Sequence, residues 1–232
     1  MYHSISSPKR GSKMRGLSVP KKLFTKQMQI LNFLGYRGLS LEKLEPYLLG
    51  KKTGKVVGIT FDDGYQDNFD NALDVLKKYN FSATCFIVSN LIDSYNKWDL
   101  KKGIERKKLM NSLEIQEWIA CGMEIGSHTC DHVRLTQSTE EEKYHQIESS
   151  KIFLERNFNI DIKSFCYPYG AFDQLSEELV RKFDYKLATT VNRGKAIIGK
   201  NMFTLPRVLV NHRTYSYLFI LKLLTNYENK RG

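Results

Sequence analysis

The sequence lacks the features that mark several special classes of protein. Its four cysteines include no C-x-x-C pair, which argues against a structural zinc cluster. A chain of 232 residues can bury a sizeable core without disulfides, so its unpaired thiols indicate a reducing compartment. Internal repeats and low-complexity segments are also missing, and the hydrophobic content of 41% is ordinary for a globular protein. We therefore expect one globular domain over residues 1–232.

No long apolar segment and no signal-peptide pattern is present. The apolar run Tyr215–Leu224 is too short to span a bilayer, and Lys222 interrupts it. This run is more typical of a buried or amphipathic last helix. We therefore predict no transmembrane segment, and the sequence as it stands indicates a cytoplasmic protein.

Negative charge is in short supply, because 25 Asp and Glu stand against 36 Lys and Arg, a formal net charge of +11. Such an excess attracts anionic partners such as nucleic acid, acidic glycans or anionic lipid. The basic residues form scattered doublets rather than long blocks, however, which favours a Lys-rich solvated surface. Since nucleic-acid binding would depend on charge alone, we expect no nucleic-acid partner.

What is present is a regular alternation of strand and helix patterns. The predicted strands are 55–61, 82–89, 123–128, 162–167, 185–191 and 203–210, and residues 1–6 resemble the end of another strand. The predicted helices are 20–36, 67–80, 112–122, 138–158, 174–183 and 215–224. Helices between strands imply an α/β fold with about seven mostly parallel strands. The irregular, charged residues 90–111 predict an insertion or a lid.

Polar residues follow several of these strands. Asp62 and Asp63 follow the first, and His128, Tyr169 and His212 come at or just after the ends of later ones. In parallel α/β folds, ligands bind beyond the carboxyl ends of the strands. The sequence therefore predicts one functional site at that edge of the sheet, within a core of about residues 55–213.

The stretch "TFDDG" places two carboxylates side by side. Neighbouring side chains of a strand point to opposite faces, so Asp62 and Asp63 can reach one site only if the backbone turns. Gly64 permits such a turn because it tolerates unusual dihedral angles. Two close carboxylates repel each other, so either one is protonated or a cation lies between them. The alternative is that both acids cap the following helix.

The stretch "HTCDH" places His128 and His132 four residues apart. If this segment is helical, both imidazoles lie on one face and can share a metal ion. Two histidines and one carboxylate leave open coordination positions, a pattern typical of catalytic metal sites. The alternative is a pair of structural histidines, which the Asp-Asp-Gly motif at another strand end makes the weaker interpretation.

The stretch "YPYG" predicts a turn that contains Pro168 and Gly170. Tyr169 in this turn has a ring that can stack on a sugar and a backbone N–H that can stabilise an oxyanion. The alternative is an ordinary turn with a packed aromatic ring.

Together, "TFDDG", "HTCDH" and "YPYG", in this order, resemble the polysaccharide deacetylases, carbohydrate esterase family four, which share the NodB-homology domain. The resemblance extends from "MYHSIS" to "LPRVLV" and implies a distorted (β/α) barrel that removes acetyl groups from N-acetylated sugars of a polysaccharide. It implies that Asp63, His128 and His132 bind one divalent transition metal, Zn²⁺ first and Co²⁺, Ni²⁺ or Mn²⁺ as alternatives. Asp62 would then be the general base for a metal-activated water, with the oxyanion held by the metal and the Tyr169 N–H.

The general acid that protonates the departing amine has two candidates. Family members carry a histidine after a late apolar strand, which corresponds to His212 in "LVNH". Related sequences also have a Tyr-His pair at the end of their first strand, which corresponds to His3 in "MYH". We favour His212 on this evidence.

Two departures from the family pattern stand out. Cys166 occupies a position where the family often has an arginine that orients the base, and no later Asp-Trp motif is present, since Trp98 and Trp118 come earlier. These departures, and "YPYG" itself, are more similar to the branch that deacetylates the exopolysaccharide poly-N-acetylglucosamine. They leave open which residue orients Asp62.

Other functions and locations stay open at this point. An O-acetyl esterase on xylan or another glycan would use the same residues, and a glycan-binding module with a decayed site would retain the fold. Relatives also have more strand before "MYH", often with a signal peptide or anchor, so a shortened N-terminus would indicate the cell envelope or the exterior.

Overall fold

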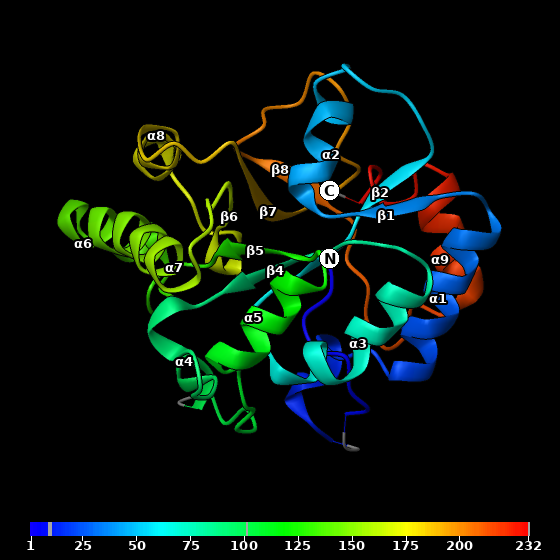
Figure 1. Ribbon diagram of the computed structural model, residues 1–232, viewed down its shortest axis with the longest axis horizontal. Coiled ribbons are helices and arrows are strands. Elements are labelled where there is room, and N and C mark those ends of the chain that lie inside the picture. The colour runs from blue at the N-terminus through cyan, green and yellow to red at the C-terminus, as the bar shows by residue number, and fades with distance from the viewer. Residues whose placement is uncertain (9–10, 101, 232) are drawn as a thin grey trace.

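The structure, a computed structural model, describes residues 1–8, 11–100 and 102–231. Strands and helices alternate along most of the chain (Figure 1). The strands are β1 (Arg37–Leu39), β2 (Val56–Gly58), β3 (Thr60–Phe61), β4 (Thr84–Ile87), β5 (Glu124–Ser127), β6 (Ser164–Cys166), β7 (Leu187–Arg193) and β8 (Leu205–Arg207). The helices are α1 (Lys21–Phe33), α2 (Leu41–Leu48), α3 (Gln66–Lys78), α4 (Lys97–Leu100), α5 (Ser112–Ala120), α6 (Glu140–Tyr144), α7 (Ser150–Phe158), α8 (Gln174–Lys182) and α9 (Ser216–Leu224).

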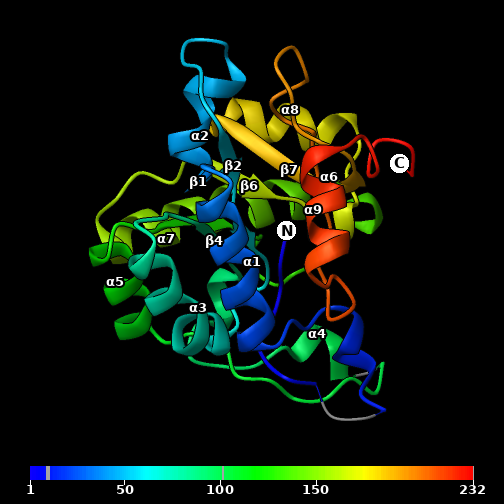
Figure 2. The same cartoon turned by 90° about the vertical axis from the view of Figure 1, so that its right-hand side faces the viewer.

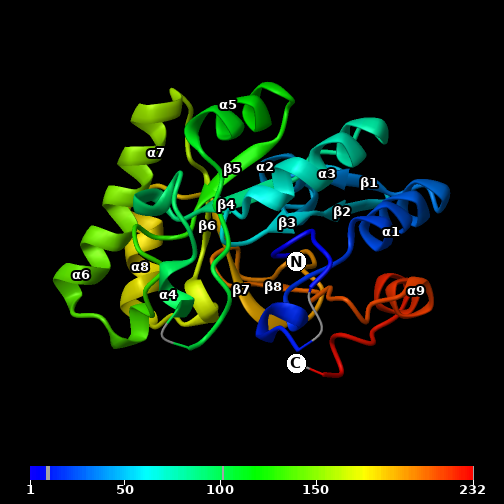
Figure 3. The same ribbon diagram turned by 90° about the horizontal axis from the view of Figure 1, so that it is seen from below.

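The six strands β3 to β8 form one sheet in sequence order, and every neighbouring pair is parallel. The strands β1 and β2 form a second, smaller parallel pair. The helices surround the strands, which curl together at the centre of the molecule (Figures 1 and 3). The predicted distorted (β/α) barrel is therefore confirmed, with six plus two strands in place of about seven.

The chain start closes the curled sheet. The Tyr2 N–H donates to the Thr60 carbonyl at 2.8 Å, and the Asp62 N–H donates to the Tyr2 carbonyl at 3.0 Å. On the other side, the Val210 N–H donates to the Met1 carbonyl at 3.0 Å. Residues 1–2 therefore pair like a strand between β3 and the segment that follows β8. The residue after this pair is His3, which is thereby carried to the same edge as Asp62.

The strand predicted at residues 55–61 is interrupted at Ile59, between β2 and β3. The strand β1 was not predicted from the sequence. The Ile59 N–H donates to the Leu39 carbonyl at 2.9 Å, so this residue turns toward β1. A Cβ atom on Gly38 would lie only 2.5 Å from the Ile59 side chain. The short, glycine-centred β1 therefore depends on a close approach between segments, which local sequence patterns do not reveal.

The predicted helix 138–158 is also interrupted. Between α6 and α7 the chain adopts π-helical geometry over residues His145–Ser149. Such bulges insert an extra residue into a helical turn and shift the face that packs inward. Ile147 within the π-helical segment and Leu154 of α7 are both fully buried.

The irregular segment 90–111 packs against the chain start and one end of the barrel. It contains α4, which lies beside the N-terminal segment at the lower end of the view in Figure 2. Isolated antiparallel bridges join Tyr95 to Lys108 and Tyr65 to Leu109. Backbone pairing therefore joins the segment to itself and to the residue before α3. Residue 101 lies outside the described residues. The prediction of a lid or insertion at these residues stays a prediction.

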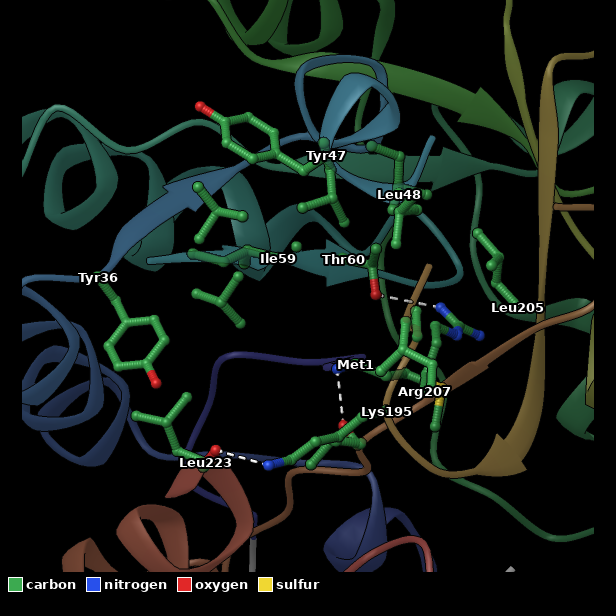
Figure 4. A pocket seen from close by; sticks show the side chains of 18 of the residues that line it. Met1, Tyr36, Tyr47, Leu48, Ile59, Thr60, Lys195, Leu205, Arg207 and Leu223 are labelled. Carbon is green, nitrogen blue, oxygen red and sulfur yellow. Dashed lines mark hydrogen bonds between the residues drawn. The ribbon is translucent and has the colours of Figure 1, made fainter. Parts of the chain in front are cut away.

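A cavity of about 800 Å³ lies between the smaller strand pair, β7, β8 and the helices α1, α2 and α9. Apolar side chains of α1, α2, β2 and α9 are among its lining residues, and Figure 4 shows Thr60 and Arg207 in its wall. Arg207 in this wall hydrogen-bonds both to Thr60 and to Asp62, so the cavity adjoins the residues around Asp62. Among the described residues, no helix has the length and apolar composition needed to cross a membrane.

Candidate metal and catalytic site

Asp62 and Asp63 follow β3, and both are buried. The turn that redirects them begins at Asp63 itself, whose φ is +73°, and continues at Gly64, whose φ is +70°. The sequence predicts a turn that depends on Gly64, and the structure adds the second left-handed residue. A left-handed conformation costs a non-glycine residue free energy and is often retained where function requires it. The turn lets the two acids reach one site.

Three of the predicted ligands meet at this edge of the sheet. The Nε2 atoms of His128 and His132 lie 3.4 Å and 3.2 Å from the Asp63 Oδ1 atom. One ligand atom from each of the three residues lies within 4.8 Å of the other two. All three side chains are buried, so each pays a large desolvation cost that a shared cation would offset.

The two histidines converge through a turn and not through a helix. His128 directly follows β5, and the residues after it form a turn in which Thr129 and His132 have φ values of +66° and +59°. The helical geometry considered for this stretch is therefore wrong. The Thr129 hydroxyl accepts a hydrogen bond from the His132 N–H at 3.0 Å, which closes the turn.

The chemistry of the ligand atoms fits a divalent transition metal. The His128 Nδ1 atom donates to the Cys166 carbonyl at 2.7 Å, because a carbonyl oxygen can only accept. That bond fixes the tautomer in which Nε2 carries a free lone pair, and Nε2 is the atom that faces Asp63. Two imidazole nitrogens and one carboxylate suit such an ion and leave coordination positions open.

Asp62 is not part of this group of three residues but pairs with Arg207 of β8. The two carboxylate oxygens accept from Arg207 Nη1 and Nη2 at 2.6 Å and 2.7 Å. Exposed fractions are 2% for Asp62 and 6% for Arg207, so water screens this pair poorly. Burial alone would raise the pKa of Asp62, but the guanidinium, with a smaller effect from His3, lowers it below its ordinary value. Asp62 is therefore ionised at neutral pH.

Arg207 is itself fixed on several sides. Its Nε donates to the Thr190 carbonyl at 2.8 Å. Its Nη1 donates to the Thr60 hydroxyl at 3.2 Å, a bond that Figure 4 shows. Its Nη2 also lies 3.2 Å from the Cys166 sulfur. The guanidinium thus reaches Cys166, the position at which the family resemblance led us to expect an arginine, but it comes from another strand. The sequence interpretation missed Arg207, although an arginine inside the apolar run "LPRVLV" is an unusual residue to bury.

The structure places the two candidate acids differently. The Nε2 atom of His3 lies 3.8 Å from the Asp62 Oδ2 atom. His212 has both ring nitrogens buried and without a hydrogen-bond partner in the part of the chain that the structure describes. Neither a hydrogen bond nor an ion pair joins His212 to Asp62 among those residues. Of the two candidates, His3 is thus the one that lies next to Asp62 in the described residues.

Tyr169 lies beside the ligand cluster. Its φ is +59°, within the short turn Pro168–Gly170, and its ring packs edge-on against His132 with centroids 4.6 Å apart. Gly170 is needed at the next position, because a Cβ atom there would lie 2.4 Å from a methyl group of Val191. Lys102 and Arg134 cover the Tyr169 ring with their cationic groups. Stacking of this ring on a sugar stays a prediction.

Comparison with known proteins agrees with this geometry. Residues 49–188 match the family model described as polysaccharide deacetylase. The chain is 33% identical to the Bacillus subtilis protein YxkH over 213 residues, which are 91% of this chain and 70% of that protein. It is 28% identical to the poly-beta-1,6-N-acetyl-D-glucosamine N-deacetylase of Staphylococcus epidermidis, over 90% of this chain and 73% of the relative.

One solved structure shows the similarity of the fold. The Streptococcus pyogenes deacetylase PplD, solved in complex with acetate, superimposes with a TM-score of 0.84 and 24% identity, over 97% of this chain and 96% of that one.

Proposed function

Because the chain belongs to the polysaccharide deacetylase family, we propose that it is a metal-dependent hydrolase that removes acetyl groups from N-acetylated sugars of a polysaccharide. The observation that carries this proposal is an ionised carboxylate, Asp62, held by Arg207 next to three converging ligands. One acid is thereby left free for proton transfer while its neighbour belongs to the ligand set. That division of roles is what hydrolysis of an amide by an activated water needs.

Asp63, His128 and His132 would hold the metal, for which we propose Zn²⁺, with Co²⁺, Ni²⁺ or Mn²⁺ as alternatives. When bound, such an ion acts as a Lewis acid that polarises a carbonyl and lowers the pKa of water. The decayed glycan-binding alternative is weakened by the complete ligand set and by the ion pair on Asp62.

The remaining residues supply the proton transfers and the oxyanion contact. Asp62 would accept the proton of the attacking water, and Arg207 keeps this carboxylate ionised and oriented. The backbone N–H of Tyr169 would stabilise the negative charge that develops on the acetyl oxygen. His3, which lies beside Asp62, would protonate the amine as it leaves.

Replacing each of the two candidate acids by glutamine in turn tests the assignment of the general acid to His3. His3→Gln is expected to lower kcat for acetate release by about 10²-fold, because the departing amine loses its proton donor. His212→Gln is expected to change kcat by less than about threefold, since no hydrogen bond or ion pair joins that ring to Asp62 among the described residues. Initial rates on N-acetylglucosamine oligomers measure both. The reverse ranking, with His212→Gln much slower than His3→Gln, would return the acid role to His212.

We propose an N-acetylated polysaccharide such as poly-β-1,6-N-acetylglucosamine as the substrate. Support comes from the name of the Staphylococcus epidermidis relative and from the similarity of "YPYG" to that branch. An O-acetyl esterase acting on xylan or another glycan is the second candidate, since the same residues can cleave an ester.

A panel of acetylated glycans tests the function directly. We expect acetate release from N-acetylated oligomers to exceed release from O-acetylated xylan, to stop on treatment with a chelator, and to return when a divalent transition ion is added. Enzymatic measurement of free acetate provides the readout. Faster release from the O-acetylated polymer would favour the esterase, and full activity in chelator would contradict the role of the ligand cluster.

A further inference from the structure

The two histidines of the ligand cluster are held in different ways. His128 has an ordinary support, a hydrogen bond from its Nδ1 to the Cys166 carbonyl at 2.7 Å. The Nδ1 atom of His132 is buried and has no hydrogen-bond partner among the described residues. Metal-binding imidazoles nearly always use the second ring nitrogen for such a bond, which fixes the plane of the ring. Another contact must therefore orient His132.

Two aromatic rings pack against the imidazole of His132. The ring of Trp98 stacks on it, with centroids 4.3 Å apart and an angle of 23° between the planes. Tyr169 meets the imidazole edge-on, with centroids 4.6 Å apart and an angle of 72°. A ring that packs against one parallel and one perpendicular neighbour loses freedom to rotate.

The position of Trp98 is set by the segment 90–111. Two residues before it, Asn96 is fully buried and binds across the segment with its side chain. The Asn96 Oδ1 atom accepts from the Lys107 N–H at 2.7 Å, and Nδ2 donates to the Glu105 carbonyl at 3.1 Å. These bonds join the two ends of the loop that contains α4, so they hold the backbone that carries Trp98 in place. The charged, irregular segment 90–111 thus places the ring of Trp98 against His132.

We propose that Trp98 is a positioning residue of the metal site. Its stacking replaces the missing hydrogen bond on His132 and holds the Nε2 lone pair of that histidine toward Asp63. The inference rests on the proposed function, because it requires that the cluster binds a metal ion. It goes further by assigning to the segment 90–111 a role in metal affinity rather than in covering the substrate alone.

Matched substitutions test the proposal through metal binding rather than catalysis. Trp98→Phe keeps an aromatic face, whereas Trp98→Leu keeps apolar bulk without a ring. Tyr95→Leu makes the same kind of change in the same segment, at a residue whose ring contacts the cationic groups of Arg106 and Lys97 and, among the described residues, has no aromatic contact with the ligands. Dissociation constants for Zn²⁺ are measured by competition with a chromophoric chelator, and the absorption spectrum of bound Co²⁺ reports the geometry of the ligands.

We expect Trp98→Leu to weaken Zn²⁺ binding by about tenfold or more and to alter the Co²⁺ spectrum. Trp98→Phe and Tyr95→Leu should stay within about threefold of the unchanged protein, and circular dichroism should show that all variants are folded. Unchanged affinity and spectrum in Trp98→Leu would overturn the proposal, as would an equal loss in Tyr95→Leu. If the unchanged protein itself binds neither ion, the proposed function fails as well, which is a distinguishable result.

Discussion

Replacement of Asp62 by Asn is expected to lower kcat for acetate release by about 10⁴-fold, the upper end of what a general base contributes. An amide has almost the shape of a carboxylate but cannot accept the proton of an attacking water. Zn²⁺ affinity should stay within a few-fold, because Asp62 is not one of the three converging ligands. Initial rates on N-acetylglucosamine oligomers and chelator competition measure the two quantities on the same sample.

The neighbouring acid provides the matched control. Asp63→Asn changes the same kind of group one residue away, but it should weaken Zn²⁺ binding and activity together, because Asp63 belongs to the ligand set. The new amide of the Asp62→Asn variant leaves Arg207 only partly paired, which we expect to cost about 3 kcal/mol of stability, so thermal unfolding is measured alongside. Near-normal kcat in a folded, metal-loaded Asp62→Asn protein would exclude Asp62 as the base.

The location of the site could be predicted from the sequence because it follows from a general property of parallel sheets. Once the strand before Asp62 and the strand before His128 are recognised, their carboxyl ends must meet at one edge. The motifs supplied the identity of the ligands by resemblance, and the structure brings those side chains within reach of one another. Neither step required knowledge of the detailed backbone.

The backbone of the site could not be predicted in the same way. Asp63, Thr129, His132 and Tyr169 all have positive φ values, although none of them is glycine. Local preference disfavours this conformation at each position, so only the surrounding tertiary structure can impose it. A helix is the conformation that local spacing suggests for "HTCDH", and it is wrong for this reason.

Arg207, the partner of Asp62, could not be predicted from local sequence for a related reason. Arg207 is 145 residues from Asp62 in the chain. Their contact depends on the chain start, which pairs with β3 on one side and with the segment after β8 on the other. Pairings of such high sequence separation leave no local pattern. The buried arginine in an apolar strand was the one signal available.

Replacement of Arg207 by Met is expected to lower kcat/KM at neutral pH by about 10³-fold, within the range that a general base contributes. Arg207 lowers the pKa of Asp62 against the effect of burial, which raises it. Without the guanidinium, the pKa of Asp62 therefore rises. Since a base acts only when it is ionised, the acid limb of the pH profile should move to higher pH, and activity should partly recover as the pH is raised.

Arg207→Lys separates the charge from the geometry. A lysine keeps a cation near Asp62 but cannot form two parallel hydrogen bonds, so the carboxylate stays ionised and loses its fixed orientation. We expect a loss of about tenfold to 10²-fold in kcat/KM with little movement of the acid limb of the pH profile.

The lysine variant also serves as a control for misfolding, because removal of one partner of a buried ion pair costs about 3 kcal/mol or more of stability in the Met variant. Zn²⁺ affinity should be nearly unchanged in both, since Arg207 contacts no ligand side chain among the described residues. A purely structural arginine would predict lower stability with an unshifted pH profile, and that result would remove Arg207 from the catalytic account.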